Sequence, residues 1–562
     1  MGTAPLKHNG LSHSDSKTKA DILNHQFCDA FTREDVNTIP NMDDSPHPDM
    51  PAIRVNTNGV HKLLSNLNPK KAAGPDDIPC RLLKELASEL APVLTLLFNK
   101  SLASGEIPSI WKHARVQPVF KKGDRSLPGN YRPISLTCVC CKLLEHIVTS
   151  EISSHLNKYN IITDAQHGFR KKRSCESQLI LTVDDLAATV DKAGQTDTIL
   201  LDFSKAFDKV PHKRLLLKLD YYGIRGQTKR WIENFLVGRT QQVVVEGKTS
   251  TIGPVISGVP QGSVLGPLLF LIFINDLESG LHSRVRLFAD DTIMYAPIES
   301  PNDAVHLQED LLKLEAWASK WQMAFNVDKC LLLSVSRKRT RIPTSYTLNG
   351  QTLARVPEAK YLGVNMTENL HWGTHVQSIA AKANRVCAFI HRNLKGCSTK
   401  IQTHCYKSLA CPILEYASSV WDPHQQNLID TLEMTQRRAA RRILEDYSTK
   451  TSASALVAKL HLEPLHKRRA IDKVSMIYKI INDLVDISTQ TNRIQKVSRC
   501  TRGHQSKLQV PHACTITYKY YFFPSAIRMW NSLEQTSIAA SSASSFKSSL
   551  KEWSYNDLYN YN

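Results

Sequence analysis

Apolar residues near the start of the chain recur with the period of a helix. Val60, Leu64 and Leu67 repeat at this spacing, and the turn sequence GPDD at 74–77 then ends the pattern. A second apolar pattern of the same period covers residues 81–102. The sequence therefore predicts two helices at the start of its ordered part.

The fifty residues before these helices have a different composition. Residues 1–50 are polar and rich in Asn, Ser, Asp and Pro, with one short helical pattern at 19–31. Such a composition offers little apolar surface to bury. We expect residues 1–50 to be a largely disordered linker or the remnant of a larger protein.

Short strands and helices alternate between residues 112 and 365. The apolar run 198–203 reads as a buried strand, 240–262 as a hairpin that ends in a turn, and 284–296 as two β-prone runs around a pair of acids. An amphipathic helix is predicted over 307–321. These elements indicate an α/β fold.

Beyond residue 370 the chain is predicted to be helical and basic. The net charge is +19, and residues 372–562 carry 26 basic and 13 acidic residues. Arginines and lysines cluster in two helical stretches, 432–444 and 466–483. A field of this sign attracts polyanions, with nucleic acid the commonest candidate and acidic membranes the second, although a solvated basic surface has the same composition.

The cysteines and the apolar runs bear on location. Thirteen cysteines are scattered without a disulfide framework, and no secretory signal follows Met1. The longest apolar run, 264–274, is too short to span a bilayer. We expect an intracellular protein of the nucleus and cytoplasm, with no membrane partner.

Two adjacent acids, Asp290 and Asp291, lie between the two β-prone runs of 284–296. One interpretation is a hairpin turn, because Asp tolerates turn geometry. The other is a metal site. Asp202 closes an apolar strand, where an unpaired charge is costly, and pairing of the strands would let bound cations compensate the repulsion of all three acids.

Five sequence motifs resemble those of a known protein family, and this resemblance favours the metal site. Their order and spacing are similar to those of the reverse transcriptases of jockey-like, LINE-type non-long-terminal-repeat retrotransposons, over about residues 51–365. The tail resembles the thumb and C-terminal region of the same family. The motifs are DFSKAFDKV (202–210), GVPQGSVLGPLLF (258–270), FADDT (288–292), FNVDK (325–329) and YLGV (361–364).

The resemblance implies a right-hand polymerase with fingers, palm and thumb. The palm would be α+β with an antiparallel sheet, and a basic, mainly helical C-terminal region would follow it. The implied ranges are an N-terminal extension with fingers at 51–195, a palm at 196–365, a thumb at 366–487 and a C-terminal region at 488–562, with the reverse transcriptase domain at about 112–365.

The resemblance also assigns a metal centre. Asp202, Asp290 and Asp291 would hold two Mg²⁺ ions, for which Mn²⁺ could substitute, and the carbonyl of Phe203 would be a further ligand. The alternative for the side chain of Asp291 is that it points away from the first metal. The alternative for all three acids is a set of surface turns.

Further residues would contact the incoming nucleotide. Phe207 matches the bulky residue that excludes a 2′-hydroxyl, although simple core packing is its alternative role. Gln261 and Gly262 match a turn that contacts nucleotide and template, where a missing side chain allows close approach. An ordinary β-turn would account for these two residues equally well without the other motifs.

Three basic residues complete the implied site. Lys121 and Arg132 resemble finger residues that neutralise the triphosphate, and their alternative is solvation at the surface. Lys329 is either the general acid that protonates pyrophosphate or a lysine at a strand edge.

The implied activity is RNA-directed DNA polymerisation, with template RNA, a DNA primer and deoxynucleoside triphosphates as partners. An endonuclease domain normally precedes such a polymerase, and the chain begins at what looks like the linker after it. Either a separate endonuclease nicks the DNA, or the chain is a truncated copy. One rival is a catalytically inactive, element-derived nucleic-acid-binding protein. The other is an RNA-dependent RNA polymerase, against which Phe207 and Ala289 argue.

A second metal pattern is discounted. Cys500, His504, His512 and Cys514 have a spacing that fits no common zinc finger or knuckle. We expect no zinc at these residues.

Overall fold

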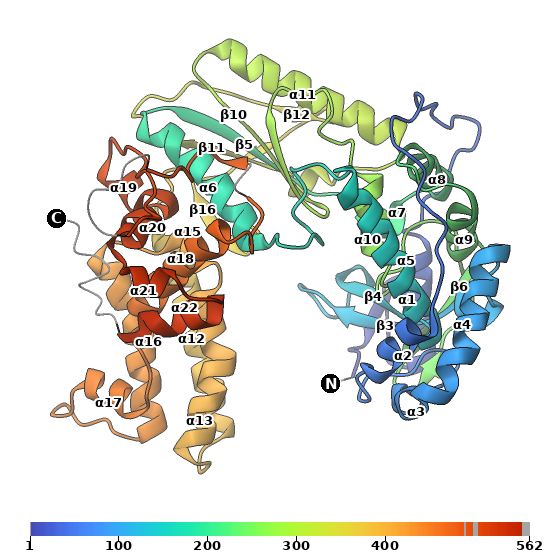
Figure 1. Ribbon diagram of the computed structural model, residues 1–562, viewed down its shortest axis with the longest axis horizontal. Helices are drawn as coiled ribbons and strands as arrows, with labels where there is room; N and C mark the ends of the chain where they lie inside the picture. Colours follow the sequence, from blue (N-terminus) through green and yellow to red (C-terminus); the bar gives the residue numbers. More distant parts are fainter. Residues whose placement is uncertain (1, 488–489, 498–503, 553–562) are drawn as a thin grey trace. The chain divides into compact units, whose positions relative to one another are not determined.

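The computed structural model describes residues 2–487, 490–497 and 504–552 (Figure 1). The chain forms two compact units, and each unit combines three segments of the sequence. Unit 1 contains Met1–Gln166, Asp202–Leu281 and Leu312–Asn326, and unit 2 contains His167–Leu201, His282–Leu311 and Val327–Asn562. The implied domains are continuous ranges, so their boundaries do not coincide with these units and stay predictions.

The N-terminal fifty residues are more ordered than the sequence predicts. A hairpin of β1 (Leu6–His8) and β2 (Leu11–His13) leads into helix α1 (Ser16–Cys28). Leu23 and Phe27 of α1 are buried in a core that includes Val243 of another element. The prediction of a largely disordered linker is therefore wrong for this stretch, because its apolar face is covered by a strand more than 200 residues away.

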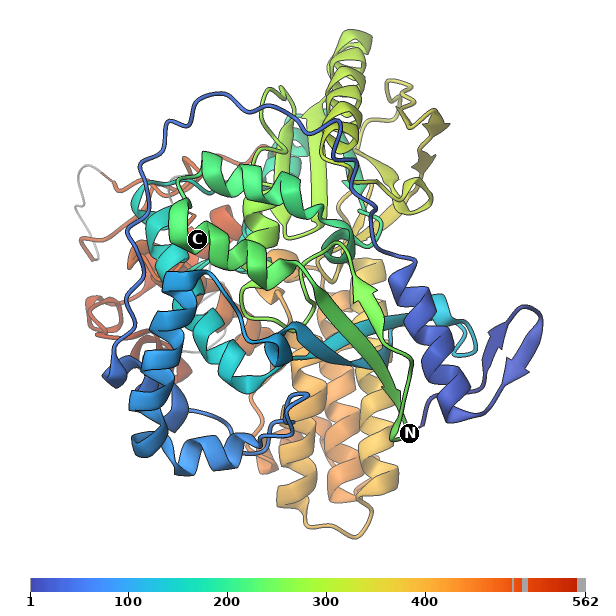
Figure 2. The ribbon, with the colours of Figure 1, turned by 90° about the vertical axis from the view of Figure 1, so that its right-hand side faces the viewer.

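The sheet of unit 1 runs in the order β4-β3-β6-β7, and β8 also pairs with β6. Strands β3 and β4 are antiparallel, whereas β3 and β6 are parallel. Helix α1 lies against β6 (Figure 2). The strands are β3 (His113–Phe120), β4 (Tyr131–Leu136), β6 (Arg239–Val245), β7 (Lys248–Thr249) and β8 (Gly253–Val255).

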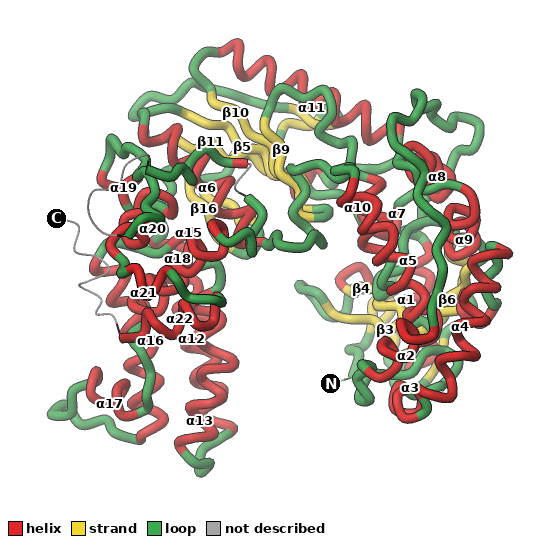
Figure 3. Tube along the Cα trace, viewed as in Figure 1, coloured by secondary structure: helices red, strands yellow, loops and turns green. Residues whose placement is uncertain are grey.

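Helices surround this sheet (Figure 3). The two helical patterns at the start of the chain are confirmed by α2 and by the pair α3 and α4. Besides α1, the α-helices that lie wholly within unit 1 are α2 (Thr57–Ser65), α3 (Cys80–Glu85), α4 (Ala87–Ser104), α5 (Val139–Lys158), α7 (Ala206–Lys209), α8 (His212–Tyr221), α9 (Gly226–Leu236) and α10 (Gly266–Phe273).

The main sheet of unit 2 has the order β14-β11-β5-β10-β9. Its central strand β5 is antiparallel to both neighbours, and all seven of its residues are buried. The predicted buried strand is thus confirmed, although it ends before Asp202. The strands are β5 (Gln195–Leu201), β9 (Arg284–Phe288), β10 (Asp291–Pro297), β11 (Leu331–Ser336) and β14 (Ala354–Arg355).

Two small hairpins belong to unit 2, and one long helix is divided between the two units after Leu311. The long helix α11 (Pro301–Lys320) confirms the amphipathic helix predicted over 307–321. The hairpins are β12 (Thr347–Leu348) with β13 (Gln351–Thr352), and β15 (Glu358–Tyr361) with β16 (Val364–Thr367).

One hydrophobic core joins the sheet of unit 2 to the C-terminal helices. It includes Leu200 of β5, Ile293 of β10, Trp421 and Trp530. The described part of residues 488–562 is therefore an integral part of unit 2. The α-helices that lie wholly within unit 2 are α6 (Cys175–Asp191), α12 (Gly373–Asn393), α13 (Thr399–Cys405), α14 (Cys411–Glu415), α15 (Ser418–Trp421), α16 (Gln426–Leu444), α17 (Ala453–Lys459), α18 (Leu465–Ile481), α19 (Ile516–Lys519), α20 (Phe522–Ser532), α21 (Gln535–Ile538) and α22 (Ala543–Ser549).

None of the helices in the described ranges combines the length and the apolar content that crossing a membrane requires.

A buried carboxylate fixes the start of α10. Glu145 of α5 is fully buried, and its Oε2 accepts hydrogen bonds from the backbone N–H groups of Val264, at 2.7 Å, and Leu265, at 3.1 Å. These donors precede the first turn of α10, where the helix leaves N–H groups without intrahelical partners. The charge of the carboxylate also suits the positive end of the helix dipole.

Replacing this carboxylate tests its contribution to stability. Glu145→Ala is expected to lower the free energy of unfolding by about 2–4 kcal/mol, because two buried N–H groups lose their acceptor. The measurement is the midpoint of urea unfolding. Glu151→Ala, at an exposed position of the same helix, should leave the midpoint nearly unchanged. Equal midpoints for the two variants would contradict the assignment.

Candidate active site

The two adjacent acids lie where β9 turns into β10. Phe288 pairs with Asp291, so Ala289 and Asp290 form a two-residue hairpin turn. Ala289 has a φ of +54°, a left-handed conformation that costs an alanine about 1 kcal/mol. The side chain of Asp290 is half-buried, and that of Asp291 is exposed. The hairpin interpretation is confirmed, and it leaves a metal-binding role open.

The register of the central strands relates these acids to Asp202. Leu201, the last residue of β5, pairs with Thr292 of β10. Asp202 follows Leu201 directly, and Asp290 and Asp291 directly precede Thr292. All three acids therefore come at the same end of two neighbouring strands.

A metal centre is not evident from proximity alone. Within the described ranges, no group of three or more His, Cys, Asp or Glu side chains is arranged to hold a metal ion. The three-acid centre accordingly stays a prediction. Of the discounted zinc pattern, Cys500 lies outside the described residues, and His504 Nε2 is 3.0 Å from the carbonyl oxygen of Trp530.

The backbone around Asp202 is held by the FNVDK motif. The carbonyl of Asp202 accepts a hydrogen bond from the N–H of Asn326 at 2.7 Å, and the N–H of Ser204 donates to the carbonyl of Ala324 at 2.8 Å. Between them, the rings of Phe203 and Phe325 stack with centroids 4.5 Å apart. These bonds use the neighbours of Phe203 and do not involve its carbonyl, the predicted ligand.

Phe207 is held rigidly in unit 1. Its ring stacks on Phe270 of α10, with centroids 4.5 Å apart and planes inclined by 20°. Its carbonyl accepts a hydrogen bond from the N–H of Val259 at 2.8 Å. The ring remains half-buried, so packing leaves part of it accessible. Both roles considered for this residue are compatible with such a position.

Gln261 contacts an acid to which the sequence assigns no role. Its Nε2 donates a hydrogen bond to Asp208 Oδ1 at 2.9 Å. Burial raises the pKa of Asp208, whereas the hydrogen bond from Gln261 and the charges of Lys205 and Arg132 lower it. Gln261, Asp208 and Arg132 therefore belong to one electrostatic cluster. The only signal for Asp208 is its place in DFSKAFDKV.

Gly262 allows the turn to approach β4 closely. Its φ is +113°, and a Cβ atom there would lie 2.5 Å from the carbonyl oxygen of Ser135. The N–H of Ser135 donates to the carbonyl of Gln261 at 2.7 Å. This bond fixes the turn against the strand that carries Arg132.

The three basic candidates are exposed, and they belong to two different units. Lys121 follows β3, and its N–H donates to the carbonyl of Asn130 at 2.9 Å. Arg132 pairs with Val119 in the adjoining hairpin. Lys329 ends a short 3₁₀ turn in unit 2, just before β11. Their contacts with a nucleotide stay predictions.

The basic residues of the C-terminal third divide into a surface set and a buried set. Arg469 and Lys473 of α18 both pair with Asp422, at 2.8 and 2.9 Å, and all three side chains are buried. These two residues belong to the run 466–483. The expectation that the basic helices face nucleic acid is therefore wrong for them, because their charges are neutralised within the core.

Three lysines of the surface set line a groove. Lys400, Lys407 and Lys459 are exposed and line a groove between α13 and α17, together with His404 and His461. Among the residues that the structure describes, no acidic side chain lines this groove. Its charge suits a phosphate backbone.

Comparison with known proteins agrees with the five motifs. Residues 119–366 match the family model described as reverse transcriptase (RNA-dependent DNA polymerase), which confirms the resemblance. The matched segment contains every predicted site residue, from Lys121 to Lys329.

Curated relatives extend the likeness beyond this segment. The RNA-directed DNA polymerases from mobile element jockey of Drosophila melanogaster and Drosophila funebris are 29% and 30% identical over 413 residues, which cover 70% of this chain and 44% of each relative. A probable RNA-directed DNA polymerase from transposon BS of Drosophila melanogaster is 26% identical over 436 residues, covering 74% of this chain and 47% of the relative. The chain spans less than half the length of these relatives.

The close approach at Gly262 can be tested by adding one methyl group. Gly262→Ala is expected to lower the free energy of unfolding by about 2–3 kcal/mol, because backbone strain and a backbone clash act together. Gly247 provides the control: its φ is +79°, but nothing lies within 4 Å of a Cβ there. Gly247→Ala should cost only about 1 kcal/mol. Urea unfolding compares the two, and equal losses would refute the close contact.

Proposed function

We propose that this chain, in which residues 119–366 form a reverse transcriptase domain, is an RNA-directed DNA polymerase. It would add deoxynucleotides to a primer 3′-hydroxyl, in the order given by a template RNA. The observation that carries this proposal is the register of β5 and β10, which brings Asp202, Asp290 and Asp291 to the same end of two central strands.

The donor atoms of these residues suit magnesium. Carboxylate and carbonyl oxygens are the ligands that Mg²⁺ takes from proteins, and Mn²⁺ accepts the same set. Asp202, Asp290 and Asp291 would hold two such ions, with the Phe203 carbonyl as a further ligand. When bound, the ions would lower the pKa of the primer hydroxyl and neutralise charge on the leaving pyrophosphate.

The remaining residues would position the nucleotide. Phe207 would lie against the sugar and exclude a 2′-hydroxyl by its bulk. Gln261 and Gly262 would form the surface against which the nucleotide and the template base pack. Arg132, with Lys121, would neutralise the triphosphate.

Lys329 would take part in proton transfer. As a general acid, its ammonium group would deliver a proton to the leaving pyrophosphate oxygen. Its exposed position before β11 is compatible with that role.

The helices after residue 370 would hold the template–primer duplex. Lys382 and Arg385 of α12 and Arg438 of α16 are exposed. Contacts from these side chains to phosphates would give strong salt dependence and little sequence preference. Template RNA and a DNA primer would thus be the partners, and the primer would be a DNA end nicked by an endonuclease. Such a reaction would take place in the nucleus, after synthesis of the protein in the cytoplasm.

Removing one acid of the hairpin tests the proposed activity. Asp290→Ala is expected to reduce primer extension on poly(rA)/oligo(dT) by about a thousandfold, because several kcal/mol of transition-state stabilisation are lost. Asp43→Ala, at an exposed N-terminal position, should extend normally. Duplex binding without any incorporation by the unmodified protein would instead support a catalytically inactive nucleic-acid-binding protein.

The choice of sugar depends on Phe207. Phe207→Ala is expected to weaken the preference for dTTP over UTP by about 10- to 100-fold, because the steric barrier to the 2′-hydroxyl is removed. The measurement is the ratio of kcat/KM for the two nucleotides on the same template. Phe389→Ala removes an exposed phenylalanine of α12 and should keep the ratio. An unmodified protein that prefers UTP would identify an RNA polymerase.

A further inference from the structure

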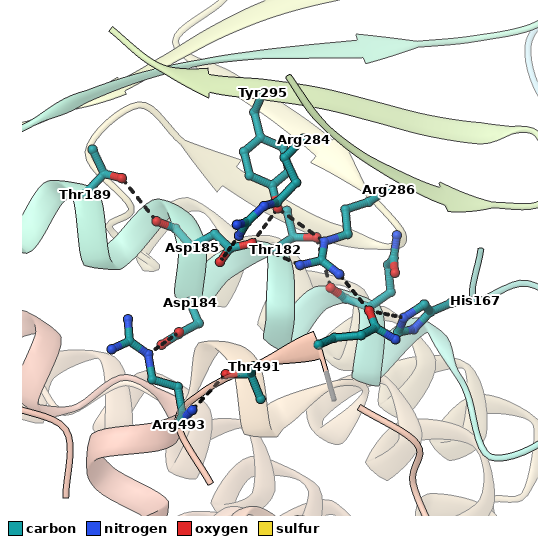
Figure 4. A network of polar contacts seen from close by, with 12 residues as sticks. His167, Thr182, Asp184, Asp185, Thr189, Arg284, Arg286, Tyr295, Thr491 and Arg493 are labelled. Atoms are coloured by element: carbon teal, nitrogen blue, oxygen red, sulfur yellow. Dashed lines mark hydrogen bonds and ion pairs between the residues drawn. The ribbon is translucent and has the colours of Figure 1, made fainter. Parts of the chain in front are cut away.

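A polar network underlies the hairpin that carries Asp290 and Asp291 (Figure 4). Its centre is the carboxylate of Asp185 on α6, which receives donors from both strands of the hairpin. Arg284 Nη1 lies 2.6 Å from Oδ1, whereas Arg286 Nη2 and the Tyr295 hydroxyl donate to Oδ2 at 3.1 and 2.6 Å. Asp185 therefore ties β9 and β10 to the same helix.

Arg286 and Tyr295 are both buried, at 6% and 4% exposure. Arg286 Nε also donates to the Tyr295 hydroxyl at 3.2 Å, so the two strands are joined by side chains as well as by backbone. Charged hydrogen bonds of this kind are strong when water is excluded. Loss of an acceptor, the Asp185 carboxylate or the Tyr295 hydroxyl, would leave a buried N–H of Arg286 unsatisfied.

The third partner of Arg286 comes from the far end of the sequence. Arg286 Nη1 donates to Gln490 Oε1 at 2.8 Å. His167 Nε2 lies 3.3 Å from the same oxygen, and the N–H of His167 donates to the carbonyl of Leu287 at 2.8 Å. Gln490 thus accepts from the guanidinium of Arg286, three residues before Ala289 in the turn.

The segment that carries Gln490 is itself fixed to α6. Arg493 Nε donates to Asp184 Oδ2 at 3.0 Å, and the Tyr518 hydroxyl lies 3.2 Å from Oδ1 of the same carboxylate. About two turns further along α6, Asp191 accepts hydrogen bonds from the N–H and the hydroxyl of Thr515 in a later segment, both at 2.7 Å. The bond of Arg493 to Asp184 therefore anchors the short stretch that presents Gln490 to Arg286.

The hairpin needs such support for two reasons. Strand β9 is at the edge of its sheet, so it pairs with β10 alone. The turn also contains Ala289 in a left-handed conformation. A strained turn persists only when its surroundings determine its geometry. The hydrogen bonds of Arg286 hold β9, which has no second neighbouring strand in the described part of the chain to fix its position.

We propose that Gln490 is a positioning residue for the Asp290–Asp291 hairpin, acting through Arg286, and that the C-terminal segment at 490–493 is thereby part of the polymerase site. This inference rests on the proposed function for its effect on catalysis. Its structural half, the dependence of hairpin order on Gln490, is independent of activity. A displacement of about 1 Å at reacting groups can cost about a hundredfold in rate.

The test compares Gln490→Ala with Gln509→Ala in the full chain. Gln509 is an exposed glutamine of the same C-terminal region and serves as the matched control. Two quantities are measured for each variant: amide hydrogen exchange of the peptide covering 284–297, and kcat with the duplex Kd in primer extension. Gln490→Glu, which keeps an acceptor oxygen for Arg286, is the conservative variant.

Gln490→Ala should speed exchange in 284–297 by about tenfold and lower kcat by 10- to 100-fold, with an unchanged duplex Kd and unchanged exchange in β3 and β4. Gln490→Glu should restore most of both. Unchanged exchange in the hairpin, or faster exchange throughout the chain, would overturn the inference. If the unmodified protein does not extend a primer, the proposed function fails, and the exchange data alone decide the role of Gln490.

Discussion

The pairing of β5 with β10 and β11 is the constraint on which the rest of unit 2 depends. Strand β5 is central and fully buried, yet it carries polar residues. Asp197 is satisfied by the hydroxyl groups of Thr344 and Tyr346 at 2.5 and 2.8 Å. A slip of one residue would exchange the two buried faces of β5 and move this carboxylate away from both hydroxyl groups. The same register sets where Asp202 leaves the sheet.

Local patterns predicted much of the fold. The buried strand, the hairpin at 284–296 and the helix α11 follow from periodicity and turn chemistry, because their patterns are complete within the segment itself. Helix α1 shows where this approach ends. Its apolar residues are few, and the surface that covers them belongs to β6, more than 200 residues later. For the same reason, local patterns did not predict that each of the two units combines three separate segments of the sequence.

The candidate site divides in the same way. The acids, Phe207, Gln261 and Gly262 were predicted because they belong to motifs with a fixed spacing. Asp208 lies inside such a motif but has no role assigned by it, and Asp185 lies outside every motif; their importance comes from partners such as Gln261 and Arg286. Basic composition was also an incomplete guide, since Arg469 and Lys473 neutralise the buried Asp422. A charge count cannot separate side chains that face solvent from those that complete a core.

The shared core of unit 2 has a consequence for biosynthesis. Helix α6 and Thr515, which caps a later helix and bonds to Asp191, are separated by more than 300 residues. On the ribosome, the sheet would emerge well before the helices that cover it, with apolar surface exposed in the meantime. Nascent chains would thus depend on chaperones until the segment around Thr515 has been synthesised, and products that end before it would be substrates for proteolysis.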